Sequence, residues 1–223
     1  ALSIWMVITL AGCSEDRDLL GQGSSVGVFT ISVEVPGATV EGTRALTETQ
    51  DSHIDKIDLF VFRDDNGTPR VVDAIEIDAA GITNNGPYKT FKATLPVGDG
   101  RKYGFVVFAN SRNEIDVNPI ELLPPEILVQ YTKEKVLEEW VTEINMYSEW
   151  DTTTPRYLPM WGESVDFIEL KSASTPIPTI PMLRSVARMD VELSAAAAAD
   201  LELTEVRIIN FMEKGQPFPD EDK

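Results

Sequence analysis

The sequence predicts a mainly β protein: an antiparallel β-sandwich with a helical insertion, followed by the start of a second β-sandwich that the sequence does not complete. Five apolar or alternating runs occur by residue 110, separated by short turn signals, as in sandwich domains. Between residues 118 and 150 the apolar period lengthens to that of a helix. Hydrophobic residues make up 43% of the 223 residues and charged residues 25%. These ordinary globular values exclude a disordered chain and a polytopic membrane protein.

The first expected strand covers residues 26–35 and alternates strictly between two faces. Its more apolar face consists of Phe29, Ile31, Val33 and Val35. We therefore expect a half-buried strand, which ends at Pro36-Gly37.

Four more strands are expected before the helical stretch, at residues 54–62, 71–77, 89–97 and 103–110. The first two form a hairpin, because Asp64-Asp65-Asn66-Gly67 lies between them and Asn and Gly tolerate a positive φ. A calcium loop is the alternative interpretation of these acids. The alternating oxygen ligands and distant glutamate of an EF-hand are lacking, so the hairpin turn is favoured.

The helical insertion is predicted from the spacing of five apolar residues, with Thr132 as the N-cap. These residues are Val136, Leu137, Trp140, Val141 and Ile144. A further short strand is expected at residues 165–170. The three prolines of residues 174–181 hold the chain extended and indicate an interdomain connection. We therefore expect the first domain to cover residues 26–180 and the start of the second to cover residues 181–223.

The N-terminal segment predicts a lipoprotein. Residues 1–12 form an uncharged apolar run that is too short to span a membrane as a helix. Such a run is typical of the apolar part of a signal peptide, and we expect that the first residues of this signal peptide are missing from the sequence. Leu10-Ala11-Gly12-Cys13 has the form of a bacterial lipobox, so residues 1–13 are read as a truncated signal peptide with its lipobox and Cys13 as the lipidated residue. The alternative is a buried free cysteine. Residues 14–25 then form a polar tether between the lipid and the first strand.

Charge and composition exclude several function classes. Lys and Arg number 19 against 37 acids, a net charge of −18, which repels nucleic acid. One histidine and one cysteine cannot build a Cys/His zinc site. No catalytic pair or phosphate-binding glycine loop occurs, so we expect no enzyme, metal or cofactor. Several aromatic residues offer stacking platforms for sugars, with core packing as the alternative: Trp140, Tyr147, Trp150, Tyr157 and Trp161.

Four segments together resemble the fimbrillin family of Bacteroidales, the lipoprotein-precursor pilins of the type V pilus. They are the lipobox at residues 10–13, residues 43–47 (TRALT) before residues 54–67 (IDKIDLFVFRDDNG), residues 158–162 (LPMWG) and residues 184–191 (RSVARMDV). The resemblance implies two transthyretin-like β-sandwiches, the second incomplete here. One departure is Trp161, which stands where a small or hydroxyl residue is more usual in the family. These residues leave open whether the subunit belongs to the shaft, the tip or the anchor.

The resemblance also implies a mode of assembly. An arginine-specific protease would cut after Arg44 and leave Ala45 as the new N-terminus. The first strand, with Phe29, Ile31, Val33 and Val35, would be displaced and replaced by a donor strand from another fimbrial subunit. A solvated loop arginine is the alternative interpretation of Arg44. The resemblance implies a fimbrial adhesion subunit at the outer membrane surface; the alternative function is a surface lipoprotein that binds glycans, or an anchor or tip subunit that does not polymerise.

Overall fold

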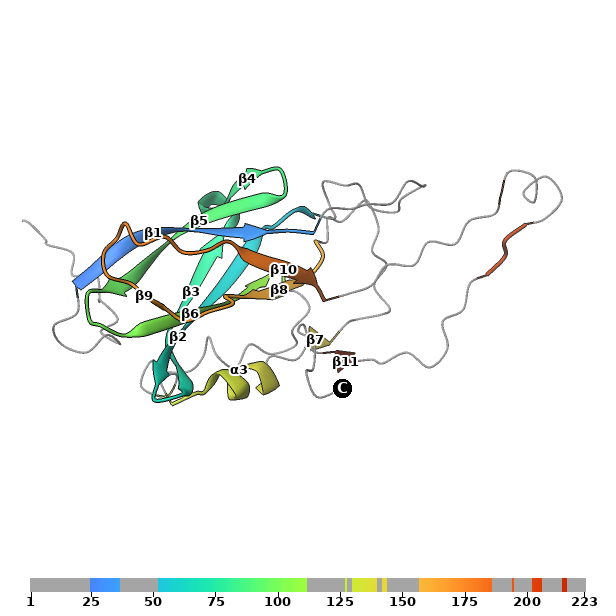
Figure 1. The fold of residues 1–223 in the computed structure, drawn as a ribbon. Coiled ribbons are helices and arrows are strands. Elements are labelled where there is room, and N and C mark those ends of the chain that lie inside the picture. The colour runs from blue at the N-terminus through green and yellow to red at the C-terminus, as the bar shows by residue number, and fades with distance from the viewer. Residues whose placement is uncertain are drawn as a thin grey trace, which may run out of the picture.

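The fold is a β-sandwich with a short helix on one outer face (Figure 1). The structure is a computed structural model, and it describes residues 25–36, 52–111, 127, 130–139, 142–143, 157–185, 194, 202–205 and 214–215. The first sheet contains β4 (Thr83–Asn85), β5 (Tyr88–Val97) and β1 (Ser25–Glu34). The second contains β3 (Thr68–Asp78), β2 (Lys56–Asp65), β6 (Lys102–Ala109) and β8 (Met160–Glu163), with β9 (Ile168–Glu169) beside β6. A mainly β fold is thereby confirmed.

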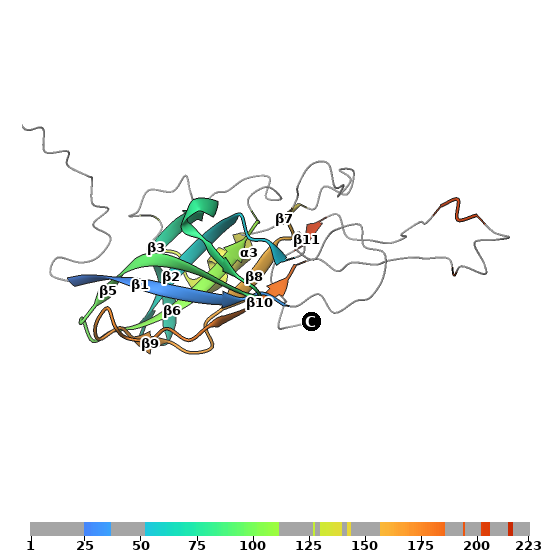
Figure 2. The same cartoon turned by 90° about the horizontal axis from the view of Figure 1, so that it is seen from above.

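One strand joins the two sheets along a common side. β10 (Ile180–Arg184) pairs antiparallel with β8 and parallel with β1, so the strands follow one another in a single curled sheet. A short 3-10 turn, η1 (Ala79–Gly81), links β3 to β4. Outside this sheet, β7 (Thr142–Glu143) pairs with β11 (Lys214–Gly215). Figure 2 shows β1 and β5 lying across the strands of the second sheet.

The β2-β3 hairpin forms where the sequence predicts it. Asn66 and Gly67 have φ values of 58° and 85°, the left-handed backbone that a tight hairpin requires. The Gly67 N–H donates to Asp64 Oδ1 at 2.7 Å. The side chain of Asp64 therefore stabilises the turn, which confirms the hairpin interpretation of this acidic segment.

The main core lies between the two sheets and is built from alternating strand residues. β1 and β5 contribute one set of inward side chains, which are Phe29, Ile31, Val33, Phe91, Ala93 and Leu95. The facing set from β2 and β6 is Ile57, Leu59, Val61, Tyr103, Phe105 and Val107. Alternation in the sequence thus becomes two interdigitating faces, as expected for a sandwich.

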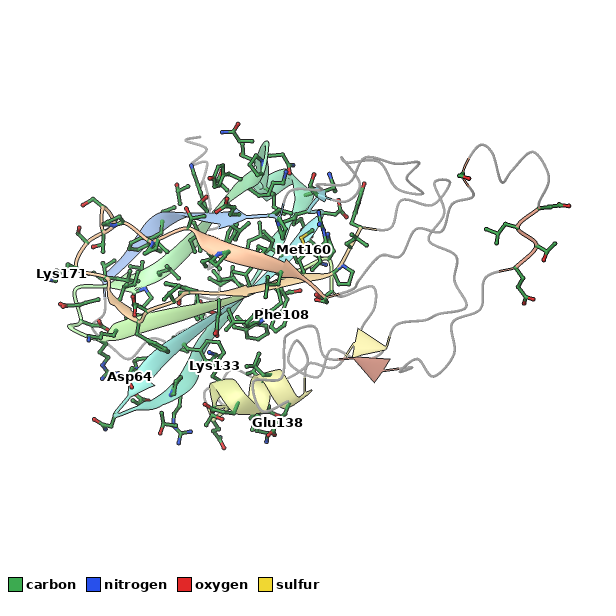
Figure 3. The ribbon with its side chains drawn as sticks, turned by 45° about the vertical axis from the view of Figure 1, so that its right-hand side comes forward. Asp64, Phe108, Lys133, Glu138, Met160 and Lys171 are labelled. Carbon is green, nitrogen blue, oxygen red and sulfur yellow. The ribbon has the colours of Figure 1, made fainter. Side chains whose placement is uncertain are left out.

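A second apolar cluster lies on the outer face of the second sheet, under α3 (Lys133–Glu139). Its buried members are Phe60, Phe62, Val71, Val106, Phe108, Val136 and Trp161. The helix starts as predicted, because Thr132 Oγ1 accepts the Lys135 N–H at 3.3 Å. Lys133, labelled on α3 in Figure 3, forms an ion pair with Glu163 of β8. The helix thereby covers an aromatic face that would otherwise contact water.

The structure differs from the sequence prediction after residue 157. β8 occupies Met160–Glu163, whereas the strand expected at residues 165–170 is reduced to the two residues of β9. The reason lies at Ser164, whose N–H donates to the Phe105 carbonyl and whose Oγ accepts the Phe105 N–H. Val165 beyond it is 87% exposed, so the chain leaves the sheet there.

The curled sheet continues past residue 180, because β10 ends at Arg184. Most of the start of the second domain, expected at residues 181–223, lies outside the described residues. Within the described ranges, no helix is long and apolar enough to cross a membrane.

Candidate functional site

The candidate site is β1, the first strand that the structure describes. It pairs with β5 at ten consecutive positions, from Ser25 opposite Val97 to Glu34 opposite Tyr88. The four residues predicted to face inward, Phe29, Ile31, Val33 and Val35, are each at most 2% exposed. β1 is thus an integral part of the core, and its loss would expose the core side chains that these four residues cover, together with the edge of β5.

The other edge of β1 is held differently. Within the described residues, strand pairing with β10 is limited to two positions, Val33 with Ile180 and Glu34 with Pro181. Near the start of β1, Gly27 is close to Ala173, since a Cβ at Gly27 would stand 2.9 Å from the Ala173 Cβ. The chain between these two contacts includes Pro176 and Pro178, which carry no N–H to donate to a ladder. One edge of β1 is therefore fully paired and the other is paired only at its end.

The C-terminal end of β1 is fastened from two sides. The Val35 N–H donates to the Pro87 carbonyl at 2.8 Å, in the turn between β4 and β5. On the other side, Arg184 Nη2 donates to the Pro36 carbonyl at 2.9 Å, joining the ends of β1 and β10. These bonds hold the chain immediately before the segment that contains Arg44.

Lys89 lies next to this end of β1, directly opposite Val33. The residue is 4% exposed, and its Nζ donates to the Gly86 carbonyl at 2.6 Å. Burial lowers the pKa of the Lys89 ammonium below its ordinary value of 10.5. Partial desolvation of this ammonium, which has one acceptor among the described residues, disfavours its charged form in the folded state.

Lys89→Met is expected to raise the free energy of unfolding by about 1 kcal/mol, because the apolar stem stays and the desolvated charge is removed. The Gly86 carbonyl lies in an exposed turn, where water replaces the lost donor. Since the folded state lowers the Lys89 pKa, the unfolded state binds more protons as the pH approaches 10.5, and wild-type stability rises in that range. The gain from Lys89→Met should therefore shrink between about pH 7 and about pH 10. Urea unfolding at both values measures it.

Lys92→Met is the matched control, because Lys92 is an exposed residue on the opposite face of the same strand. It should change stability by less than about 0.5 kcal/mol. A Lys89→Met protein that is no more stable than the wild type would contradict the assigned cost of the buried ammonium.

At the same end of the sandwich, Asn110 joins three segments of the chain, which are its own strand end, residues 53–56 and Leu158. Its backbone N–H donates to the Lys56 carbonyl at 3.0 Å, and its Oδ1 accepts the Asp55 N–H at 2.9 Å. Its Nδ2 donates to the carbonyls of His53 at 2.8 Å and Leu158 at 3.1 Å. Asn110 is buried and has a φ of 57°, a conformation that few side chains other than Asn adopt readily. It thereby connects the end of β6 to residues 53–56 and to Leu158.

At the opposite end, where β1 begins with Ser25, two polar pairs form local hydrogen bonds in or beside the turns. The Tyr103 hydroxyl donates to Asp99 Oδ2, and burial together with this hydrogen bond raises the pKa of Tyr103. Arg63 donates through Nε and Nη2 to the two Asp65 oxygens at 2.8 and 3.0 Å. These hydrogen bonds hold the pKa of Asp65 below its usual range. Both pairs are hydrogen-bonded locally and position the turns.

Three predicted site residues lie outside the described residues: Cys13, Arg44 and Ala45. Of the five aromatics of the predicted sugar platform, only Trp161 and Tyr157 lie among the described residues. Trp161 is 9% exposed and packs in the cluster under α3, so it is a core residue. Tyr157 stacks on His53 with ring centroids 4.0 Å apart. The remaining aromatics of that prediction, Trp140, Tyr147 and Trp150, are not among the described residues.

Sequence reasoning missed three residues that this geometry makes important: Lys89, Asn110 and Gly162. Lys89 occupies an inward position of an alternating strand, and that position was the available signal. Asn110 directly follows a buried apolar run, where an Asn is compatible with a left-handed turn. Gly162 allows β10 to approach β8, which only the packing of two distant segments reveals.

The fold defines the structural class of this protein. It is a β-sandwich in which β1 contributes its inward side chains to the core and pairs with β5 along one full edge. Within that class, the chain belongs to the family of fimbrillin-A associated anchor proteins Mfa1 and Mfa2, whose family model matches residues 25–215. The resemblance to the Bacteroidales fimbrillins is thereby confirmed, and the protein is associated with fimbriae at the cell surface.

Among solved structures, the chain is similar to a fimbrial assembly protein from Parabacteroides distasonis ATCC 8503, with 16% sequence identity and a TM-score of 0.44. The similarity covers 72% of this chain and 54% of that chain, so the present chain spans about half the length of this relative. No curated protein matches the chain.

Proposed function

We propose that this chain is a fimbrial anchor subunit, held at the outer membrane by a lipid on Cys13 and joined to other fimbrial subunits. The observation that carries the proposal is the ten-residue pairing of β1 with β5. β1 begins at Ser25, twelve residues after Cys13, so it links the expected lipid to the sandwich. Burial of its four inward side chains contributes about 1.5–3 kcal/mol each before ordering costs are subtracted. The strand is therefore suited to hold the domain at the membrane.

A second candidate function is a polymerising subunit. In this mode an arginine-specific protease cuts after Arg44, Ala45 becomes the N-terminus, and a strand from a neighbouring subunit replaces β1. The limited pairing of β1 with β10 favours it, because an incoming strand has to displace a full ladder on one edge only. Adhesion would then follow from the assembled fimbrium.

Membrane attachment tests the anchor proposal. We would express the wild type and Cys13→Ser with a complete lipoprotein signal in a fimbriated Bacteroidales host and separate membrane and soluble fractions. The wild type is expected in the outer membrane fraction with fimbrial subunits attached, and Cys13→Ser in the soluble fraction. Cells lacking the chain should release their fimbriae into the medium. A Cys13→Ser protein that stays with the membrane would contradict the lipid anchor.

Protease treatment separates the two modes. Cleavage after Arg17 would cut the tether and leave β1 in place, whereas cleavage after Arg44 would separate β1 from the rest of the chain. Arg17→Lys and Arg44→Lys block one cut each. In the anchor mode, the Arg17→Lys protein that is cut only after Arg44 is expected to keep β1 paired with β5 and to stay monomeric. A ladder resistant to detergent, formed by Arg17→Lys but not by Arg44→Lys, would establish the polymerising mode.

A further inference from the structure

We infer that β1 and β10 form a load-bearing contact, through which tension between the membrane tether and the chain beyond Arg184 is resisted in shear. The inference rests on the proposed attachment at Cys13, which would place the pull at the N-terminal end of β1. It adds a mechanical function to that attachment.

The two strands lie side by side and run in the same direction. Val33 pairs with Ile180 and Glu34 with Pro181 in parallel register. Figure 1 shows the blue arrow of β1 and the orange arrow of β10 pointing the same way. Ser25 therefore lies at one end of the sandwich and Arg184 at the other, so a pull on these two ends acts along the strands.

The direction of the pull decides how the hydrogen bonds are loaded. Hydrogen bonds between antiparallel strands lie perpendicular to them, so a pull along the strands loads many bonds at once. Here the ten β1-β5 pairs and the three β8-β10 pairs are all loaded in this way. A pull that separates the start of β1 from β5 sideways would instead break the pairs one after another. The proposed pull, from Cys13 and from the chain beyond Arg184, corresponds to the stronger geometry.

Arg184 strengthens the contact where the two strands end. Its Nη2 donates to the Pro36 carbonyl at 2.9 Å, so the bond joins the chain two residues after β1 to the last residue of β10. Tension moves Pro36 and Arg184 apart along the strand axis and stretches this bond directly. The neighbouring Ser185 N–H donates to the Pro159 carbonyl at 2.9 Å and ties the same end to the second sheet. This bond cluster lies at the point where the load would leave the sandwich.

Single-molecule force measurements on the full chain test the inference. Cys13→Ser removes the native thiol, and handles are attached through Ser24→Cys with Ala187→Cys for the shear geometry. The control pair is Ser24→Cys with Arg101→Cys, which pulls apart the end at which Ser25 and Val97 meet. At the same loading rate we expect a rupture force several times higher in the shear geometry, because many hydrogen bonds have to break together there. Forced unfolding is governed by the unfolding rate, which is lower when the bonds are loaded together.

Arg184→Gln supplies the residue-level test. It should lower the rupture force in the shear geometry and leave the control geometry unchanged, because only the shear pull stretches the bond to Pro36. Equal rupture forces in the two geometries, or a shear force unchanged in Arg184→Gln, would overturn the inference. These readouts do not depend on lipidation, so they are independent of the fractionation of Cys13→Ser that tests the anchor proposal.

Discussion

Gly162→Ala is expected to destabilise the sandwich by about 3 kcal/mol or more, because the new methyl group meets backbone as well as a side chain. A Cβ at this position would overlap the Pro181 carbonyl oxygen and stand 2.7 Å from Met182 Sδ. β8 and β10 would have to move apart, and β10 is the strand that joins the two sheets. Urea unfolding followed by circular dichroism measures the loss.

Gly104→Ala is the matched control. It also lies in a buried strand position, but the three atoms nearest to its Cβ would all belong to the ring of Phe167, the nearest 2.8 Å away. That ring is half-buried and can shift, so we expect a loss of about 1 kcal/mol. Equal losses for the two variants would contradict the assignment of a special role to the β8-β10 approach.

Asn110→Ala should destabilise the protein by about 3–4 kcal/mol. The substitution removes the hydrogen bonds to the carbonyls of His53 and Leu158 and from the Asp55 N–H, and it leaves an alanine at a φ of 57°. Because the three segments joined by Asn110 come from distant parts of the sequence, the region around residues 53–56 should lose protection against hydrogen exchange first.

Asn66→Ala separates the two causes. Asn66 has nearly the same backbone conformation, with a φ of 58°, but lies in the exposed β2-β3 turn. Its replacement costs the backbone strain alone, about 1 kcal/mol. The difference between the two variants therefore measures the buried hydrogen bonds of Asn110, and losses of equal size would show that these bonds contribute nothing.

Five strands, β1, β2, β3, β5 and β6, were predictable because their patterns are local, whereas the three-residue β4 was not predicted. In β1, strict alternation placed Phe29, Ile31, Val33 and Val35 on one face, and all four are buried. The turn at Asn66-Gly67 and the N-cap at Thr132 were predictable for the same reason, since each depends on a few neighbouring residues.

The later strands β8 and β10 were harder to predict, because β8 is short and β10 contains and follows prolines, which are unusual in strands. β10 contains Pro181 and follows a proline-rich segment, which suggested a connection between domains. Its inward residues Ile180 and Met182 do alternate with exposed ones, so a signal was present over a short length. β8 is only four residues long, and its partners are more than fifty residues away in β6 or follow it in β10.

The candidate site was predicted in part. The strand that carries it, its inward face and the fimbrial family followed from the sequence. The lipidation of Cys13 and the cleavage at Arg44 remain predictions, because these residues lie outside the described part of the chain. The pairing of β1 was not predictable, since strand alternation specifies which side chains are buried but not which strands lie beside them.

The sequence by itself determined which residues of β1 face inward, where the β2-β3 hairpin turns and where α3 begins, because each follows from contacts between near neighbours in the chain. Only the tertiary structure decided that Lys89 is buried, that Asn110 joins three segments and that Gly162 has no room for a methyl group. Each of these depends on atoms that distant segments bring to the same place, and no local pattern encodes that meeting.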